Sequence, residues 1–116
     1  MKNELEGRTL RFALSAIQLS EALPRGAAGT VIGRQLLRSA TAIGANYREA
    51  QSAESRADFI HKVAVAEKEA AETEYWLVLC HEAGLSALEA GTLLKESREL
   101  LAILATIGRN AKRNRP

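Results

Sequence analysis

Apolar residues recur every three or four positions along almost the whole chain. From Phe59 to Cys80 the apolar and small residues step by 4, 3, 4, 3, 4 and 3, which is the unbroken heptad seam of a helix packed against other helices. Residues 36–50 and 93–111 share this spacing, and residues 5–23 carry two apolar stripes. No segment shows the sustained alternation of a half-buried strand. The pattern therefore predicts an all-α protein.

Three clusters of helix-breaking or helix-capping residues divide this pattern. Pro24 and Gly26 end any helix that begins near the N-terminus. Ser55, with Asp58 three residues later, has the spacing of a capping box, and Gly84 suits the residue that follows a helix. We expect helices at about 4–23, 28–52, 56–83 and 87–112.

Helices of this length with short links between them make antiparallel neighbours. A helix of about 25 residues is roughly 38 Å long, and residues 1–116 suffice for a single core. The sequence thus predicts one domain, an antiparallel up-down-up-down four-helix bundle. The second helix is rich in small residues around Gly44, and we interpret Gly44 as a position where two helix axes approach closely.

Composition and charge favour a cytoplasmic protein with no membrane association. The N-terminal residues carry charges from Lys2 to Arg11, so no secretory apolar region fits there. No uncharged run approaches the roughly 18 residues of a membrane span. Cys80 is the only cysteine, which excludes an internal disulfide and is compatible with a reducing compartment.

Four glutamates, Glu67, Glu69, Glu72 and Glu74, lie within eight residues of one another. On a helix they point to different sides, whereas general acid–base catalysis needs two groups aimed at one locus. We interpret them as a solvated or salt-bridged face that pairs with basic residues of the neighbouring helix. We therefore expect no enzymatic activity.

A more specific alternative to a salt-bridged face is a carboxylate-bridged di-metal site, because helical bundles host such sites. It requires two Glu-x-x-His pairs, and this chain offers only the related half-motif Asp58-x-x-His61. Cys80 and His81 are adjacent and would point about 100° apart on a helix, so they would not share a ligand. We expect neither a metal nor a cofactor.

The segment "YWLVLC", residues 75–80, is apolar on nearly every side of its helix. Tyr75, Trp76 and Leu79 cannot all face one core, and an exposed apolar patch with a tryptophan is typical of an interface. The two apolar stripes of the first helix indicate the same excess. We therefore expect a homo-oligomer with closed symmetry, which would bury these surfaces.

The last eight residues contain four basic side chains and no acid: Arg109, Lys112, Arg113 and Arg115. They are candidate contacts for the phosphates of a nucleic acid. The alternative is a solvated helix end whose positive charges suit the C-terminal helix dipole. Four charges alone would bind weakly, and oligomerisation would multiply them.

Two segments carry a resemblance to a known family. "QLLRSATAIGANYREAQ" (35–51), followed by "FIHKVAVAEKEAAETEYWLVLCHEAGL" (59–85), resembles the bacterial four-helix-bundle proteins encoded in intervening sequences of 23S ribosomal RNA genes. Tyr47 and Ala50 depart from the Ile and Gly expected of this family, which affects local helix packing. The matching positions are Arg38, Ser39, Asn46, Glu49, Glu72, Glu74, Tyr75 and Trp76.

The resemblance implies small cytoplasmic bundles that assemble as ring-like homopentamers. It also implies a relation to proteins that act beside reverse transcriptases in diversity-generating retroelements, where they bind the enzyme and RNA. No catalytic residues come with this family. The expected function is therefore an RNA- or nucleoprotein-associated adaptor whose partners are other copies of itself and RNA or a reverse-transcriptase-like nucleoprotein. The alternative is a structural or protein-interaction oligomer without nucleic-acid binding.

Polar residues beside the small residues of the second helix suggest a network that fixes helix register. We hypothesise that Asn46 and Glu49 bond across to Glu74 or to nearby groups, because buried polar groups need such partners. The residues assigned to this structural polar network are Arg38, Ser39, Asn46, Glu49 and Glu74.

Overall fold

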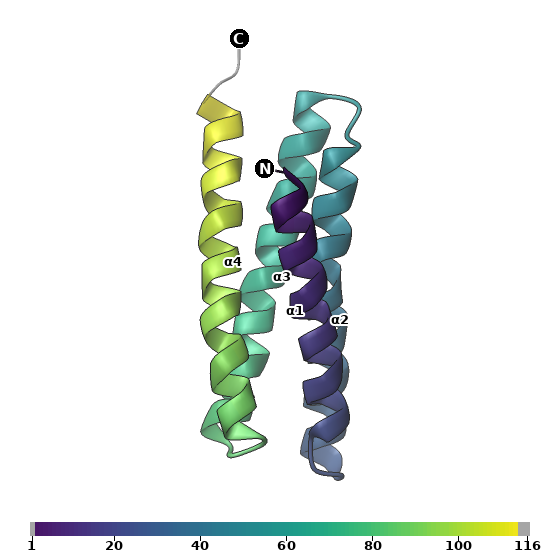
Figure 1. The fold of residues 1–116 in the computed structure, drawn as a ribbon, viewed down its shortest axis with the longest axis vertical. Coiled ribbons are helices and arrows are strands. Elements are labelled where there is room, and N and C mark those ends of the chain that lie inside the picture. Colours follow the sequence, from purple (N-terminus) through teal and green to yellow (C-terminus); the bar gives the residue numbers. More distant parts are fainter. Residues whose placement is uncertain (1, 114–116) are drawn as a thin grey trace.

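Residues 2–113 are described by the computed structural model, and over this range the chain forms four α-helices and no strand. The four helices lie side by side in an elongated molecule of 52 × 22 × 19 Å (Figure 1). The all-α fold of four packed helices is confirmed, and each helix end lies within two residues of its expected position. The helices are α1 (Lys2–Ala22), α2 (Ala27–Gln51), α3 (Arg56–Glu82) and α4 (Ala87–Arg113).

Local chemistry explains where the helices begin and end. The Ser55 side chain caps α3 by accepting a hydrogen bond from the backbone N–H of Asp58 at 3.0 Å, which satisfies a donor that the first helical turn leaves free. After α3, Gly84 has a φ of 74°, and the Leu85 N–H donates back to the Cys80 carbonyl at 2.9 Å. This left-handed ending reverses the chain into α4.

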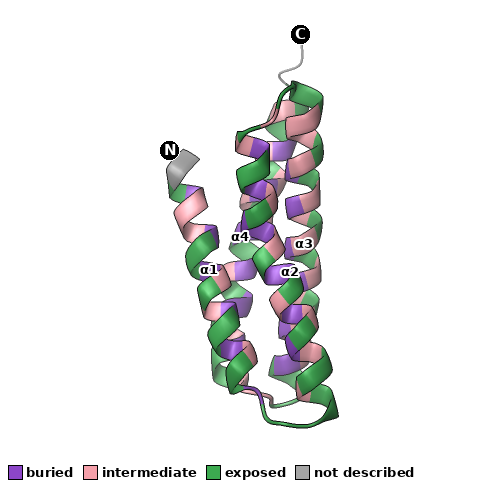
Figure 2. Cartoon of the chain, turned by 90° about the vertical axis from the view of Figure 1, so that its right-hand side faces the viewer, coloured by how far each residue is buried: buried purple, intermediate pink, exposed green. Residues whose placement is uncertain are grey.

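The helices pack around a single apolar core that runs along the long axis (Figure 2). α3 packs extensively on both α2 and α4, and α1 packs far more extensively on α2 than on α4. α1 and α3 therefore lie diagonally opposite each other, as do α2 and α4. The largest fully buried apolar side chains are Leu36, Ile43, Val63, Leu77, Leu100 and Leu104.

The flank between α1 and α2 is closely packed. Gly44 of α2 faces Thr9 of α1, and a Cβ atom added at Gly44 would lie 3.0 Å from the Thr9 Oγ1 and 3.2 Å from its Cβ. Contacts this short are tighter than ordinary van der Waals packing, so the absence of a side chain lets the two helices approach. Gly44 is thus a packing residue, in agreement with the sequence interpretation.

The flank between α1 and α4 is open by comparison. A groove of about 470 Å³ separates the second half of α1 from the start of α4. Further along, Arg8 of α1 bridges to α4, with hydrogen bonds of 2.6 and 2.8 Å to Glu96 and one of 2.6 Å to Glu99. The groove is lined by Ser15, Gln18, Leu19, Ala22, Leu88, Glu89, Thr92 and Leu93.

Candidate nucleic-acid and subunit interfaces

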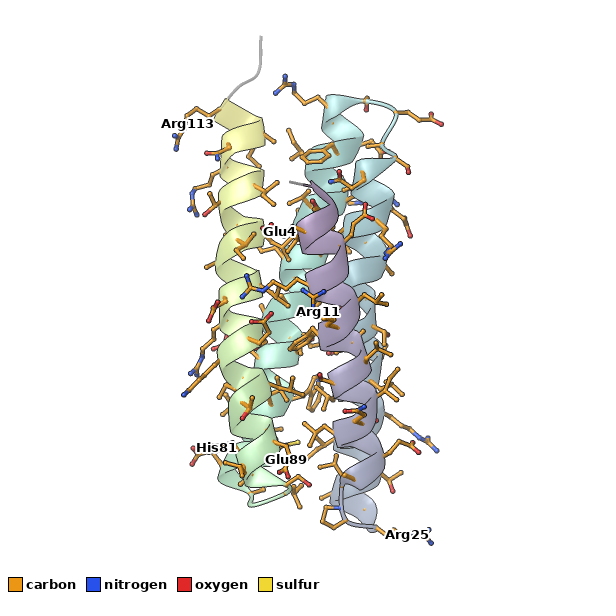
Figure 3. The ribbon with its side chains drawn as sticks, viewed as in Figure 1. Glu4, Arg11, Arg25, His81, Glu89 and Arg113 are labelled. Carbon is orange, nitrogen blue, oxygen red and sulfur yellow. The ribbon has the colours of Figure 1, made fainter. Side chains whose placement is uncertain are left out.

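The end of α4 exposes basic side chains to solvent. Arg109, Lys112 and Arg113 are all exposed, and Arg113 points away from the bundle at the tip of the helix (Figure 3). The Arg109 Nη2 donates a hydrogen bond of 3.2 Å to the Thr106 hydroxyl of its own helix. Arg115, the fourth residue of the expected phosphate contact, lies outside the described residues.

A further arginine joins these residues from the start of α3. The Arg56 Nη1 donates a hydrogen bond of 2.9 Å to the Ala111 carbonyl of α4, where helix carbonyls lack intrahelical partners and attract positive charge. No side-chain pattern in the sequence marks Arg56 as part of this surface, although an antiparallel α3–α4 hairpin places the start of α3 beside the end of α4. We call Arg56, Arg109, Lys112 and Arg113 the terminal basic cluster.

Three acids lie near the terminal basic cluster, and two of them, Glu54 and Asp58, are within two residues of Arg56. Glu67 of α3 lines a small cleft of about 140 Å³ together with Arg109 and Lys112. The other residues that line this cleft are uncharged: Ile60, Ala64, Ala105 and Gly108. The terminal basic cluster therefore keeps a net positive charge on a surface that an anionic partner can approach.

The three residues of the expected subunit interface differ in exposure. Tyr75 is 56% exposed, whereas Trp76 and Leu79 are partly buried. The Trp76 indole N–H donates to the Glu72 carboxylate at 3.0 Å, and its ring lies 5.1 Å from that of Tyr75 in an edge-on arrangement. These residues form an apolar surface on the outside of α3, which we call the α3 patch.

A second apolar surface runs along the outside of α1. Leu10 and Leu14 are each 51% exposed and Ile17 is 40% exposed, at spacings that align them on one face of the helix. We call these three residues the α1 stripe. Because α1 and α3 lie diagonally opposite each other, the α1 stripe and the α3 patch are on different sides of the molecule.

Three of the four clustered glutamates of α3 form ion pairs, two with α2 and one with α4, so the four carboxylates do not converge on one point. Arg38 of α2 pairs with Glu69 and Glu72, while Glu74 accepts a hydrogen bond of 2.9 Å from Arg98 of α4. The Trp76 indole and the Arg38 guanidinium hold the pKa of Glu72 below its usual range. This is the salt-bridged face that the sequence predicted.

The expected bond to Glu74 is not formed, and of Asn46 and Glu49 only Glu49 reaches a nearby group on the neighbouring helix. The Asn46 side chain donates to the Ala42 carbonyl of its own helix at 2.8 Å, and Glu49 pairs with Lys62 at 2.6 Å. The antiparallel register of α2 and α3 explains the difference. It sets Glu74 about eight residues, or roughly 12 Å along the helix axis, from the level of Asn46.

Ser39 makes the buried polar contact between α2 and α3. Its hydroxyl oxygen lies 2.8 Å from that of Thr73, and both side chains are fully buried. The Thr73 hydroxyl also lies 2.8 Å from the Glu69 carbonyl of its own helix, so the pair is satisfied internally. Among the five residues assigned to the network, Ser39 is the one that joins two helices in the core, whereas Arg38, Glu49 and Glu74 act in ion pairs nearer the surface.

The remaining candidate ligands are dispersed or engaged. Asp58 helps to close the turn before α3, because its carboxylate accepts a weak hydrogen bond of 3.4 Å from the Glu54 N–H. Cys80 is fully buried, and this burial raises the pKa of its thiol. Within the part of the chain that the structure describes, no three His, Cys, Asp or Glu residues are grouped to hold a metal ion.

None of the four described helices is long and apolar enough to span a membrane.

The fold and these surfaces define an antiparallel four-helix protein whose charged and apolar groups of interest lie on its outer faces. The sequence model of the 23S rRNA-intervening sequence protein family matches residues 2–106, and the chain belongs to this family. The resemblance derived from residues 35–51 and 59–85 is thereby confirmed. The matched range stops short of Arg109, so most of the terminal basic cluster lies beyond it.

A solved structure shows the same arrangement in a relative. The crystal structure of a protein of unknown function from the S23 ribosomal protein family of Bacteroides thetaiotaomicron superimposes with a TM-score of 0.85 and 40% sequence identity. The similarity covers 94% of this chain and 99% of the other. No curated protein sequence matches this chain.

Proposed function

We propose that this protein is a non-enzymatic, cytoplasmic homo-oligomeric adaptor that associates with RNA or with a nucleoprotein. The terminal basic cluster is the observation that carries this proposal. It combines cations from two helices on an exposed end of the bundle, with Glu67 as a bordering acid. Lysine and arginine neutralise phosphates without reading sequence, and each additional copy in an assembly multiplies the contacts.

The arrangement of the apolar surfaces supports a ring. A twofold dimer uses the same patch on both subunits, whereas a head-to-tail contact joins two different patches and closes into a ring when the rotation permits. The α1 stripe and the α3 patch are two such patches on different sides of one molecule. We propose that they meet between neighbouring subunits, and the family resemblance favours five subunits.

The family resemblance also indicates the kind of assembly in which such a ring acts. Proteins related to this family accompany reverse transcriptases in diversity-generating retroelements. We therefore propose a nucleoprotein that contains RNA, with or without such an enzyme, as the partner.

RNA binding is tested with a variant in which all four members of the terminal basic cluster are replaced by Gln. Because each phosphate contact contributes about 0.9 to the slope of log K against log salt, we expect the slope per bound chain to fall by roughly 3 to 4 units. The measurement is the anisotropy of a fluorescent RNA at several salt concentrations. A variant with Arg34→Gln and Arg48→Gln, two exposed residues of α2, is the matched control. An unchanged slope in the cluster variant would remove the support for this function.

The ring is tested by light scattering of the purified protein and of two variants. Leu14→Glu and Tyr75→Glu place a charge on each apolar surface at side chains that are already more than half exposed, so the fold should persist. We expect each variant to lose the assembly, and we expect Leu88→Glu, at a side chain that is 81% exposed, to retain it. A wild-type mass of one chain would contradict the proposal.

A scaffold without nucleic-acid binding is the second candidate. It is favoured by the end of the family match at residue 106, because the shared part of the chain lacks Arg109, Lys112 and Arg113. An intact ring that ignores RNA at low salt would establish this alternative.

A further inference from the structure

The terminal basic cluster continues along the outer face of α4. Positions 95, 98, 102, 105, 109 and 112 step by 3, 4, 3, 4 and 3, so they form one line along the helix. Ala102 is exposed and Ala105 partly exposed, and these small residues leave room for a bulky partner between two pairs of cations. We call the four cations, all of them exposed, the α4 basic stripe: Lys95, Arg98, Arg109 and Lys112.

The acids of α4 lie mainly toward α1, although Glu99 stands four residues after Lys95 and so borders this line. Glu96 and Glu99 hold Arg8 of α1, and Glu89 lines the groove between α1 and α4. α4 therefore separates its charges, with acids on the flank that faces α1 and cations on the outer face and the flank toward α3. This separation of charges produces a positive electrostatic potential along one side of the helix.

Two glutamates of α3 border the α4 basic stripe without neutralising it. Glu74 binds Arg98 through its Nε, which leaves the terminal nitrogens of the guanidinium for another acceptor. Glu67 shares the small cleft with Arg109 and Lys112. Glu67, Glu74 and Glu99 together set three carboxylates against four cations, so the line keeps a net positive charge, and Lys95 at its far end is exposed to solvent.

The dimensions of the α4 basic stripe fit an extended, rigid polyanion. Lys95 and Lys112 are separated by 17 residues, which is roughly 26 Å along a helix. The helix holds its cations at fixed intervals, and a duplex also presents its phosphates at regular intervals. A flexible strand would have to be ordered along this line at an entropic cost.

The α4 basic stripe contains no aromatic residue. Proteins that bind single strands gain roughly 1–3 kcal/mol per base from stacking on aromatic side chains. The exposed aromatic on the neighbouring helix, Tyr75, has its ring edge-on to Trp76. Without stacking platforms in the line itself, the favourable contacts are those to phosphates and sugars, which a base-paired helix offers along its surface.

We infer that the α4 basic stripe binds the phosphate backbone of base-paired RNA, which lies along α4 and is held without reading its base sequence. This inference rests on the proposed association with RNA and specifies the form of the RNA. It extends the contact surface from the terminal basic cluster to Lys95 and Arg98, in the first half of α4.

The test compares a fully paired RNA hairpin with an unpaired RNA strand that contains the same number of phosphates. Binding of each to the full-length protein is measured by fluorescence anisotropy at several salt concentrations. We expect the hairpin to bind more tightly. We also expect a Lys95→Gln, Arg98→Gln variant, which keeps the terminal basic cluster, to lower the salt slope for the hairpin by roughly 2 units.

The Arg34→Gln, Arg48→Gln variant is again the control, because α2 lies diagonally across the bundle from α4. If loss of the Arg98–Glu74 pair unfolds the double variant, Lys95→Glu alone makes the same test at an exposed side chain. Tighter binding of the unpaired strand, or an unchanged slope in these variants, would overturn the inference and leave the adaptor function standing. Failure of both RNAs to bind would defeat the adaptor function as well.

Discussion

The two flanks of α1 are built in different ways. On the α2 side, Gly44 lets the helices approach until Thr9 leaves no room for a side chain. On the α4 side, a groove of about 470 Å³ remains, and Arg8 reaches across to Glu96 and Glu99. One flank is stabilised by close packing and the other by a charged bridge.

The difference shows that the two contacts of one helix can respond to different changes, one to side-chain volume and the other to pH and salt. Close packing responds to volume, since interiors have little free space. An ion pair near the surface responds to pH and salt and contributes modestly to stability. Three substitutions with decreasing expected losses of stability separate these two kinds of contact.

Gly44→Val should have the largest effect, because it adds volume where the two helices already touch. Overpacking of this kind typically costs about 1–3 kcal/mol, and we expect a loss near the upper end of that range in urea unfolding. Ala45→Val on the exposed side of the same helix is the control for β-branching. Thr9→Ala should recover part of the loss, because the Thr9 hydroxyl bonds only within α1 among the described residues. Full stability of Gly44→Val would show that this flank is loose.

Arg8→Gln should have an intermediate effect of about 1 kcal/mol, since the ion pair is partly exposed and screened by solvent. Hydrogen bonds from Arg8 lower the pKa of Glu96. A lowered folded-state pKa stabilises the protein above the ordinary glutamate value of about 4.3 and loses this contribution as the pH falls through the folded value. The melting temperatures of wild type and variant should therefore differ at neutral pH and converge in acid. Arg34→Gln, at an exposed residue of α2, is the control, and a difference that persists in acid would contradict the assignment.

Ala22→Leu should have the smallest effect. Ala22 is exposed and lines the groove between α1 and α4, so the larger side chain meets open space. We expect a change within about 0.5 kcal/mol in either direction, as at other tolerant surface positions. A loss comparable to that of Gly44→Val, measured in the same urea titration, would mean that the two flanks are equally closed.

The sequence predicted the helices well because their signals are local. The heptad spacing of α3 and the Ser55 cap depend on residues close together in the chain. The structure forms the cap and buries the seam from Val63 to Cys80, while Phe59 at the helix start is only partly buried. Gly44 was also recognised, because a glycine inside a helix invites a packing explanation.

Contacts between helices were harder to predict because they depend on register. Glu74 pairs with Arg98 of α4, and the expected bond between Glu74 and Asn46 is not formed. A periodic pattern shows which face of a helix is buried, but it does not show which residues of two neighbouring helices lie at the same level. Arg56 was missed for a different reason. Its partner, Ala111, is a backbone carbonyl 55 positions away, for which no side-chain pattern exists.

The burial of Cys80 makes the thiol a natural probe of transient opening of the bundle. It is the only cysteine of the chain, it has no exposed surface, and only a thiolate attacks reagents quickly. A disulfide reagent will therefore label the native protein only in molecules whose helices have separated. The labelling rate, followed against reagent concentration, reports how often α3 becomes accessible in otherwise folded molecules.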